Sequence, residues 1–150
     1  MSVSLRDWVA NRWLVEHQTT QEEIADLLAL VDRDLKDCQA QGLSADAKLR
    51  LAYNAALQAA TAALAAAGFR TGRGESHHYR VIQTLALTIG ADAETVDEFD
   101  AFRKKRNMAD YERAGAVSDK EATEMIEFAR RLRREVKDWL RAKHPSFLGR

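Results

Sequence analysis

Cysteine is nearly absent from this chain of 150 residues, which contains only Cys38. A single cysteine forms no internal disulfide bond, so the fold is not a disulfide-stapled scaffold of the secreted type. The four histidines are scattered and have no cysteine pairs at the spacing of zinc ligands. We therefore expect neither a metal site nor a cofactor.

Long apolar runs are also missing. No segment reaches the roughly 20 apolar residues that a membrane-spanning helix needs, and residues 1–7 lack the charged-then-apolar layout of a signal peptide. These absences predict a cytoplasmic protein without a membrane partner. With only one proline, seven glycines and the length of one domain, the chain is expected to form a single domain over residues 1–150.

Net charge is absent as well, since 23 basic residues balance 23 acidic ones. The two signs are nevertheless segregated: residues 1–102 contain 9 basic and 15 acidic residues, whereas residues 103–150 contain 14 basic and 8 acidic residues. Such asymmetry fits a surface for a polyanion, a surface for a partner protein, or two parts of one fold that attract each other in a dimer. The last situation is the commonest.

Apolar residues recur at helical spacing throughout, and no segment alternates convincingly like a strand, so the expected fold class is all-α. Capping residues and glycine or proline stops divide the pattern into helices. Their expected ranges are 5–13; 21–38, with Thr20 and Glu23 as a capping box and a stop near Gly42; 45–67, before Gly68; 76–89, before Gly90; 92–111, before Gly115; and 119–144, with Ser118 and Glu121 as a second capping box.

Short connections between these helices predict an up-and-down bundle of five to six helices. Nine alanines between Ala55 and Ala67 keep the third helix slim, so that a neighbouring helix can approach it closely. After this helix, the segment from Arg70 to Glu75 is expected to be a loop.

Arg106 lies where an apolar residue is expected. At about 100° per residue, it nearly shares the direction of the apolar stripe on the fifth helix. That stripe consists of Val96, Phe99, Phe102 and Ala109. Asp110 follows one turn later and can pair with Arg106. The pair is interpreted either as a buried or interfacial ion pair that fixes packing, or as an arginine held for contact with a phosphate or a transition state.

Cations are concentrated around and after this position. Four are consecutive, Arg103, Lys104, Lys105 and Arg106, and seven more lie on the last helix. These seven are Arg130, Arg131, Arg133, Arg134, Lys137, Arg141 and Lys143. Together they are candidates for contact with nucleic-acid phosphates. The alternative is a solvated helix surface, because consecutive residues of a helix spread around its circumference.

His77 and His78 are a further candidate pair. Adjacent residues diverge by about 100° on a helix, so both cannot serve one metal ion. His78 shares the apolar stripe of its helix, whereas His77 does not. We interpret His78 as a hydrogen-bonded packing residue, with acid–base use as the alternative.

The order of several motifs resembles that of a HEPN domain over about residues 20–140. The motifs are Leu51, Ala52, Tyr53, Asn54, Ala55 and Ala56; Gly68 and Phe69; His77 and His78; and Arg106, Asn107, Asp110 and Tyr111. The resemblance implies a bundle of four to five helices, commonly homodimeric. Many such domains are metal-independent RNA-cleaving toxins or defence nucleases of toxin–antitoxin type, and others are non-catalytic partners of small nucleotidyltransferases.

The nuclease pattern in this family is an arginine, usually with a polar residue after it, and a histidine four to six residues further on. Arg106 and Asn107 match, but the next histidine is His144. The resemblance thus makes Arg106, Asn107, Asp110 and Tyr111 the catalytic candidates. The residues expected to bind RNA or a nucleotide are Arg103, Lys104, Lys105, His77 and His78. A non-catalytic binding or assembly module is expected, with a metal-independent RNase that uses another proton shuttle as the alternative.

Overall fold

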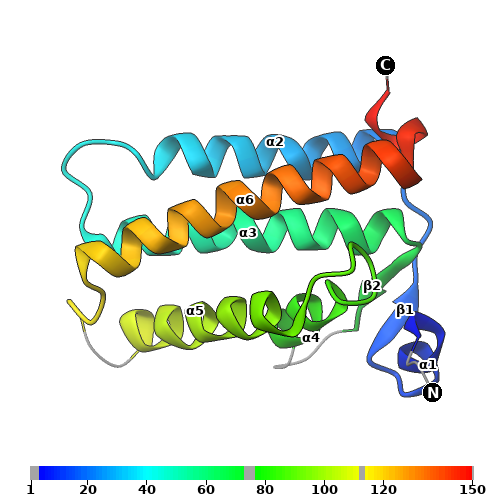
Figure 1. Ribbon diagram of the computed structural model, residues 1–150, viewed down its shortest axis with the longest axis horizontal. Coiled ribbons are helices and arrows are strands. Elements are labelled where there is room, and N and C mark those ends of the chain that lie inside the picture. Colours follow the sequence, from blue (N-terminus) through cyan, green and yellow to red (C-terminus); the bar gives the residue numbers. More distant parts are fainter. Residues whose placement is uncertain (1–3, 73–76, 112–113, 150) are drawn as a thin grey trace.

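The computed structural model describes residues 4–72, 77–111 and 114–149, without the side chains of residues 110 and 111. Three long helices lie side by side: α2 (Gln21–Asp37), α3 (Ala45–Ala66) and α6 (Asp119–Lys143) (Figure 1). On the other side of α3 lie α4 (His77–Thr84) and α5 (Ala93–Tyr111), which pack against α3 and against each other. The expected all-α class and helical bundle are confirmed. None of the helices among the described residues is long and apolar enough to cross a membrane.

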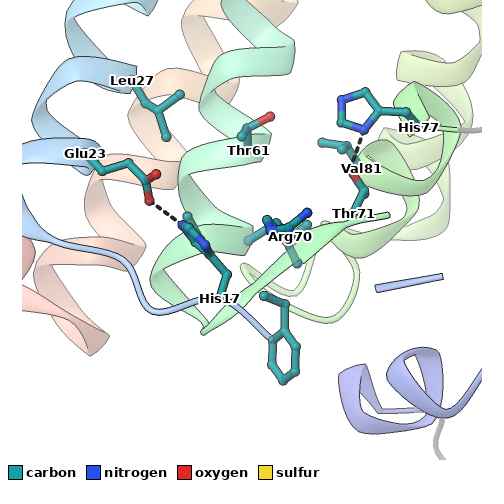
Figure 2. Close-up of a pocket in the computed structure, with 11 residues that line it drawn as sticks. His17, Glu23, Leu27, Thr61, Arg70, Thr71, His77 and Val81 are labelled. Carbon is teal, nitrogen blue, oxygen red and sulfur yellow. Dashed lines mark hydrogen bonds and ion pairs between the residues drawn. The ribbon is translucent and has the colours of Figure 1, made fainter. Parts of the chain in front are cut away.

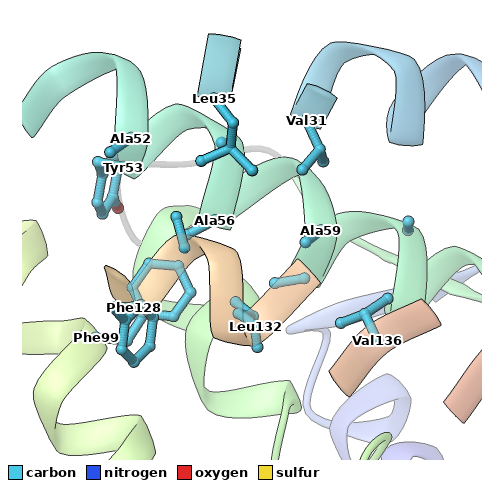
Figure 3. Close-up of a cluster of buried hydrophobic side chains, with 14 of the residues drawn as sticks. Val31, Leu35, Ala52, Tyr53, Ala56, Ala59, Phe99, Phe128, Leu132 and Val136 are labelled. Carbon is cyan, nitrogen blue, oxygen red and sulfur yellow. The ribbon is translucent and has the colours of Figure 1, made fainter. Parts of the chain in front are cut away.

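The centre of the bundle is α3, which contacts α2, α6, α4 and α5. Its alanine-rich surface is buried, and Figure 3 shows Ala56 and Ala59 among the larger side chains of α2 and α6. Phe128 and Leu132 of α6 belong to the same core cluster. Small residues on α3 therefore leave the space that the larger residues of its neighbours fill.

Helix ends agree with most of the sequence signals. The hydroxyl of Ser118 accepts a hydrogen bond from the backbone N–H of Glu121, whose carboxylate accepts one from the N–H of Ser118, so this capping box is confirmed. Gly68, with φ of 100°, follows α3 as expected. The first capping box is only half correct: Thr20 caps α2, but the Glu23 carboxylate binds His17 and Thr19 instead of the Thr20 backbone.

Two short strands correct the expectation that no strand is present. The strands β1 (Leu14–Glu16) and β2 (Phe69–Thr71) pair antiparallel, with Val15 opposite Arg70. The expected loop after α3 therefore begins with a strand. Residues 73–75 of that loop lie outside the described residues, and so does residue 76, where the next helix was expected to begin. Three residues are too few to show alternation, and the pairing joins segments that are far apart in sequence.

Two helices are shorter than expected. The first, α1 (Leu5–Ala10), ends before Trp13, whose ring instead meets the Trp8 ring edge to face with centroids 5.4 Å apart. The helix α4 ends at Thr84 instead of residue 89, because the next N–H groups of Leu85 and Leu87 bond to carbonyl groups three residues back. A 3-10 helix, η1 (Pro145–Leu148), follows α6 and packs against α2 and α6.

Candidate functional site

The run of four cations lies on α5, and the structure distributes its side chains around that helix. Arg103 donates from Nε to Oδ1 of Asp100 at 2.7 Å, and Nζ of Lys104 lies 3.4 Å from the other oxygen of the same carboxylate. Lys105 points toward α6, where Nζ lies 3.2 Å from Oε2 of Glu121. Only Lys104, with 70% of its side chain exposed, extends well into solvent. The run does not form one continuous cationic face.

Arg106 follows the apolar stripe of α5, as its position in the sequence indicated. Phe99 in that stripe is fully buried, and the other apolar members pack against the core. The guanidinium carbon of Arg106 lies 5.6 Å from the centre of the Tyr53 ring on α3, and its Nε atom is shielded from solvent. This distance is within the range of cation–π attraction. Arg106 is therefore held against the bundle interior.

The other candidates near Arg106 are less fully described. Asn107 is partly buried on α5. The backbone of Asp110 and Tyr111 belongs to the last turn of α5, but the side chains lie outside the described residues, and so does the expected pair of Arg106 with Asp110. His144 lies after α6, where its ring is close to the rings of Trp139 and Phe147.

His78 on α4 contacts the same tyrosine. Its Nδ1 atom lies 3.3 Å from the hydroxyl oxygen of Tyr53, and the imidazole is half-buried. Burial lowers the pKa of His78 below its ordinary value of 6.5, and the neighbouring His77, Arg106 and Arg103 lower it further. His78 is therefore a neutral imidazole at neutral pH. The sequence-based interpretation of a hydrogen-bonded packing histidine agrees with this geometry.

Tyr53 joins these side chains to the core. Its ring meets that of the buried Phe99 edge to face, with centroids 5.7 Å apart. Burial raises the pKa of Tyr53, which keeps its phenol protonated. We call Tyr53, His78, Arg103 and Arg106 the Tyr53 cluster. The sequence alone identifies Tyr53 only as part of the motif on the third helix. Its contacts with the histidine and the arginines could not be predicted, because they lie on different helices.

His77 is exposed and faces another element. Its Nδ1 atom forms a hydrogen bond with the hydroxyl of Thr71 on β2, and its ring centre is 5.4 Å from that of His78. Among the described residues, no group of three His, Cys, Asp or Glu side chains is placed to hold a metal ion. The two histidines thus have different protein partners.

His77 also borders a pocket of about 320 Å³ between α2, α3, β2 and α4 (Figure 2). On the opposite wall, Nε2 of His17 lies 2.7 Å from Oε1 of Glu23. Hydrogen bonds from Thr19 and then His17 lower the pKa of Glu23, so this carboxylate is ionised. About half of the lining residues are apolar. Of the lining residues, only His77 is expected from the sequence to bind a ligand, because Glu23 is assigned to a helix cap and His17 lies in a segment without a motif.

Two exposed aromatic rings, those of Trp13 and Tyr79, also lie outside the sequence motifs. The guanidinium carbon of Arg80 lies 3.9 Å from the centre of the Trp13 ring, and that of Arg103 lies 5.3 Å from the centre of the Tyr79 ring. Gln83, one turn after Tyr79, donates a hydrogen bond to its hydroxyl oxygen at 2.7 Å. The tryptophan comes from the segment between α1 and β1, so its place beside α4 follows only from the fold.

Comparison with protein families identifies the fold. The model of the HEPN domain matches residues 24–139, which include all of α3, α4 and α5 and most of α2 and α6. Among curated proteins and solved structures, no match was found. The family match covers most of the chain and includes the bundle that builds the Tyr53 cluster. This chain therefore belongs to the HEPN domain family.

Proposed function

We propose that this chain is a non-catalytic binding and assembly module of the HEPN type, which binds RNA or a nucleotide weakly through Arg106 and the other cations of α5. The observation that carries the proposal is the Tyr53 cluster. There, Tyr53 packs beneath the guanidinium of Arg106 and bonds to the imidazole of His78. Two side chains of the types that a metal-independent nuclease needs are thus engaged in packing contacts.

Ion pairs on α5 support weak rather than tight binding. Arg103 and Lys104 share the Asp100 carboxylate, and Lys105 pairs with Glu121. A phosphate that approaches these cations must compete with carboxylates already in place. Because binding through phosphates releases counterions, the affinity is expected to fall steeply with salt.

Assembly is the second part of the proposal. Membership of the HEPN family supports a homodimer, with a pair with a partner of nucleotidyltransferase type as the alternative. The cytoplasmic location is part of the proposal. In a symmetric dimer both copies contribute the same surface, so one face of the bundle is sufficient to form the interface. Sedimentation of the pure chain tests for the homodimer.

A metal-independent RNase of toxin or defence type is the second candidate function, because His78 is a neutral imidazole near two arginines. A neutral imidazole can accept the proton of a ribose 2′-hydroxyl, whose oxygen then forms a bond to phosphorus as the bond to the 5′ oxygen breaks and that oxygen takes up a proton. Arg106 would stabilise the charge on the phosphate. In this candidate, the proton shuttle is His77, His78, Asp110 or Tyr111.

One experiment tests both candidates. The wild-type protein, Arg106→Ala and Arg106→Lys are incubated with labelled single-stranded RNA in the presence of a chelator, and cleavage and retention are measured together. The proposed module retains the RNA without cleaving it, and Arg106→Ala retains less. Lys120→Ala, which removes one exposed charge from α6, is the control. Cleavage by the wild type that is lost in Arg106→Ala would replace the module with the RNase.

A further inference from the structure

A groove distinct from the pocket in Figure 2 lies between the α1–β1 segment, α4 and the start of α5. We call it the Trp13 groove. Its volume is about 630 Å³, within the range of sites for small organic ligands. Its lining residues include Trp8, Trp13, Tyr79, Arg80, Val96 and Asp97. The groove is therefore mainly apolar, with charged groups among its lining residues.

Two of the three aromatic side chains of this groove, Trp13 and Tyr79, are open to solvent, whereas Trp8 is buried. In the described part of the chain, the large hydrophobic residues classed as exposed are Trp13 at 37%, Tyr79 at 36% and Met108 at 37%. Two of these three line the Trp13 groove. Burial of such rings is favourable, so their exposure at one place indicates a surface that is covered by a ligand.

Guanidinium groups accompany both exposed rings, which narrows the chemistry of that ligand. Arg80 lies over the Trp13 ring at 3.9 Å, and Arg103 lies 5.3 Å from the Tyr79 ring centre. A guanidinium is planar, and its second face can stack on another flat ring. Unpaired nucleobases stack on aromatic rings and on guanidinium planes in this way.

The charges around the groove fit the phosphates between such bases. Arg103 belongs both to this surface and to the Tyr53 cluster, so the groove continues into the cations of α5. The side chain of Lys104, the residue after Arg103, extends into solvent. Asp100 is balanced by these two cations, whereas the exposed carboxylate of Asp97 can accept a hydrogen bond from the amino group of a base.

We infer that the Trp13 groove binds unpaired bases of single-stranded RNA, while Arg103 and Lys104 of α5 contact the adjoining phosphates. This inference rests on the RNA-binding part of the proposed function, and it adds the form of RNA and the residues that bind the bases. Bases in a duplex are stacked on each other and cannot enter the groove. The protein is therefore expected to prefer single-stranded RNA to duplex RNA.

The test measures the affinity of the full chain for a short labelled RNA, single-stranded and as a duplex, by fluorescence anisotropy at low salt. Tyr79→Leu and Trp13→Leu remove the stacking rings and keep an apolar side chain. Each is expected to raise Kd for the single strand by about 5- to 100-fold, since stacking on one aromatic ring contributes a corresponding share of affinity. Met108→Leu, at a residue of equal exposure that does not line the groove, is the control and should leave Kd unchanged.

The outcomes separate this inference from the proposed function. If the wild type and both variants bind the single strand equally well, the inference is wrong and RNA binding stands. Tighter binding of the duplex than of the single strand also overturns it. If the wild type binds neither RNA, both the inference and the RNA-binding part of the proposed function fail. Conversion of a dimer to a monomer by Tyr79→Leu would show that a second copy of the chain covers the groove.

Thermal unfolding of each variant accompanies these measurements, because Trp13 also packs against Trp8. Tyr79→Leu then decides the test if Trp13→Leu fails to fold, since Tyr79 is more than a third exposed and lies outside the core cluster. Binding of heparin provides a second readout. Heparin is a polyanion without bases, so a variant that loses only base stacking should keep its affinity for heparin. An equal loss of affinity for RNA and for heparin would contradict base stacking.

Discussion

At the scale of a single residue, Arg106 has a packing role that can be measured. Because its guanidinium lies over Tyr53 and its Nε atom is shielded, Arg106→Ala is expected to lower the free energy of unfolding by about 1–2 kcal/mol. Chemical denaturation measures this loss, with Lys104→Ala as an exposed control from the same run. An Arg106→Ala protein as stable as the wild type would contradict the packing role.

The pH dependence of stability follows from His78. Its pKa is lowered in the folded protein, so protons bind more tightly to the unfolded chain. Stability is therefore complete above about pH 6.5, the ordinary histidine value, and is lost as the pH falls toward the lower pKa of the folded state. NMR titration of the His78 ring should give a midpoint below 6.5, and His78→Gln should weaken the loss of stability on acidification.

A midpoint at or above 6.5 would contradict the burial of His78. His144 contributes in the same direction, because burial lowers its pKa too. His144→Gln therefore serves as the comparison, and the two variants together should flatten the profile more than either alone. Glu23 affects stability in a more acidic range. Its pKa is lowered in the folded protein, so its contribution to stability is lost only when the pH is low enough to protonate the carboxylate.

Single residues also show how far the sequence predicts the site. Helical periodicity was sufficient to place Arg106 on the apolar stripe and His78 toward the interior. It could not show that both contact Tyr53, since spacing along one helix says nothing about which neighbour faces it. The contact of Arg80 with Trp13 depends on two distant segments in the same way. The residues that form the candidate ligand-binding surface could therefore be identified only from the tertiary structure.

At the scale of elements, the alanines of α3 determine how closely the bundle packs. Ala59 is fully buried among side chains of α2 and α6 (Figure 3). Ala59→Leu adds volume to a filled core and is expected to lower the free energy of unfolding by about 1–3 kcal/mol, measured by urea denaturation. Gln58→Leu also introduces leucine on α3, but at a partly exposed position, and should change the free energy of unfolding much less. Equal stability of both variants would mean that α6 moves freely to make room.

Asp46 connects the beginnings of two helices. Its carboxylate accepts hydrogen bonds from the backbone N–H of Gly115 at 2.7 Å and of Val117 at 3.2 Å, just before α6. Asp46→Ala should lower the free energy of unfolding by about 1–2 kcal/mol, because two N–H groups lose a charged acceptor. Asp119→Ala, in the first turn of α6, is the control. If Asp46→Ala changes stability no more than that control, water replaces the carboxylate without loss.

Element boundaries were predictable where a local signal exists. Ser44 and Ser118 mark the beginnings of α3 and α6, and Gly68 marks the end of α3. The paired strands could not be predicted, because each has three residues and is stabilised by a partner far away in the chain. Local chemistry therefore fixes the long helices, whereas the small sheet depends on their packing.

At the scale of the whole molecule, the acidic first part and the basic last part of the chain pair with each other inside one subunit. Arg133 on α6 donates from Nε to Oδ1 of Asp32 on α2 at 2.6 Å, and Arg131 lies 3.3 Å from Glu98 on α5. Both pairs join residues before and after position 103. The segregation of charge along the sequence is thus partly balanced by contacts between helices of the same bundle.

This pairing predicts how the assembly responds to salt. Because the opposite charges already meet within each subunit, a dimer does not need them, and its dissociation should change little between about 50 and 500 mM NaCl, although screening becomes much stronger over that range. Sedimentation velocity at both concentrations measures the oligomeric state. Exposed ion pairs contribute only about 0–1 kcal/mol each, so a double-mutant cycle with Asp32→Ala and Arg133→Ala should give a coupling within that range. A dimer that dissociates at high salt would instead place the acidic part of one copy against the basic part of another.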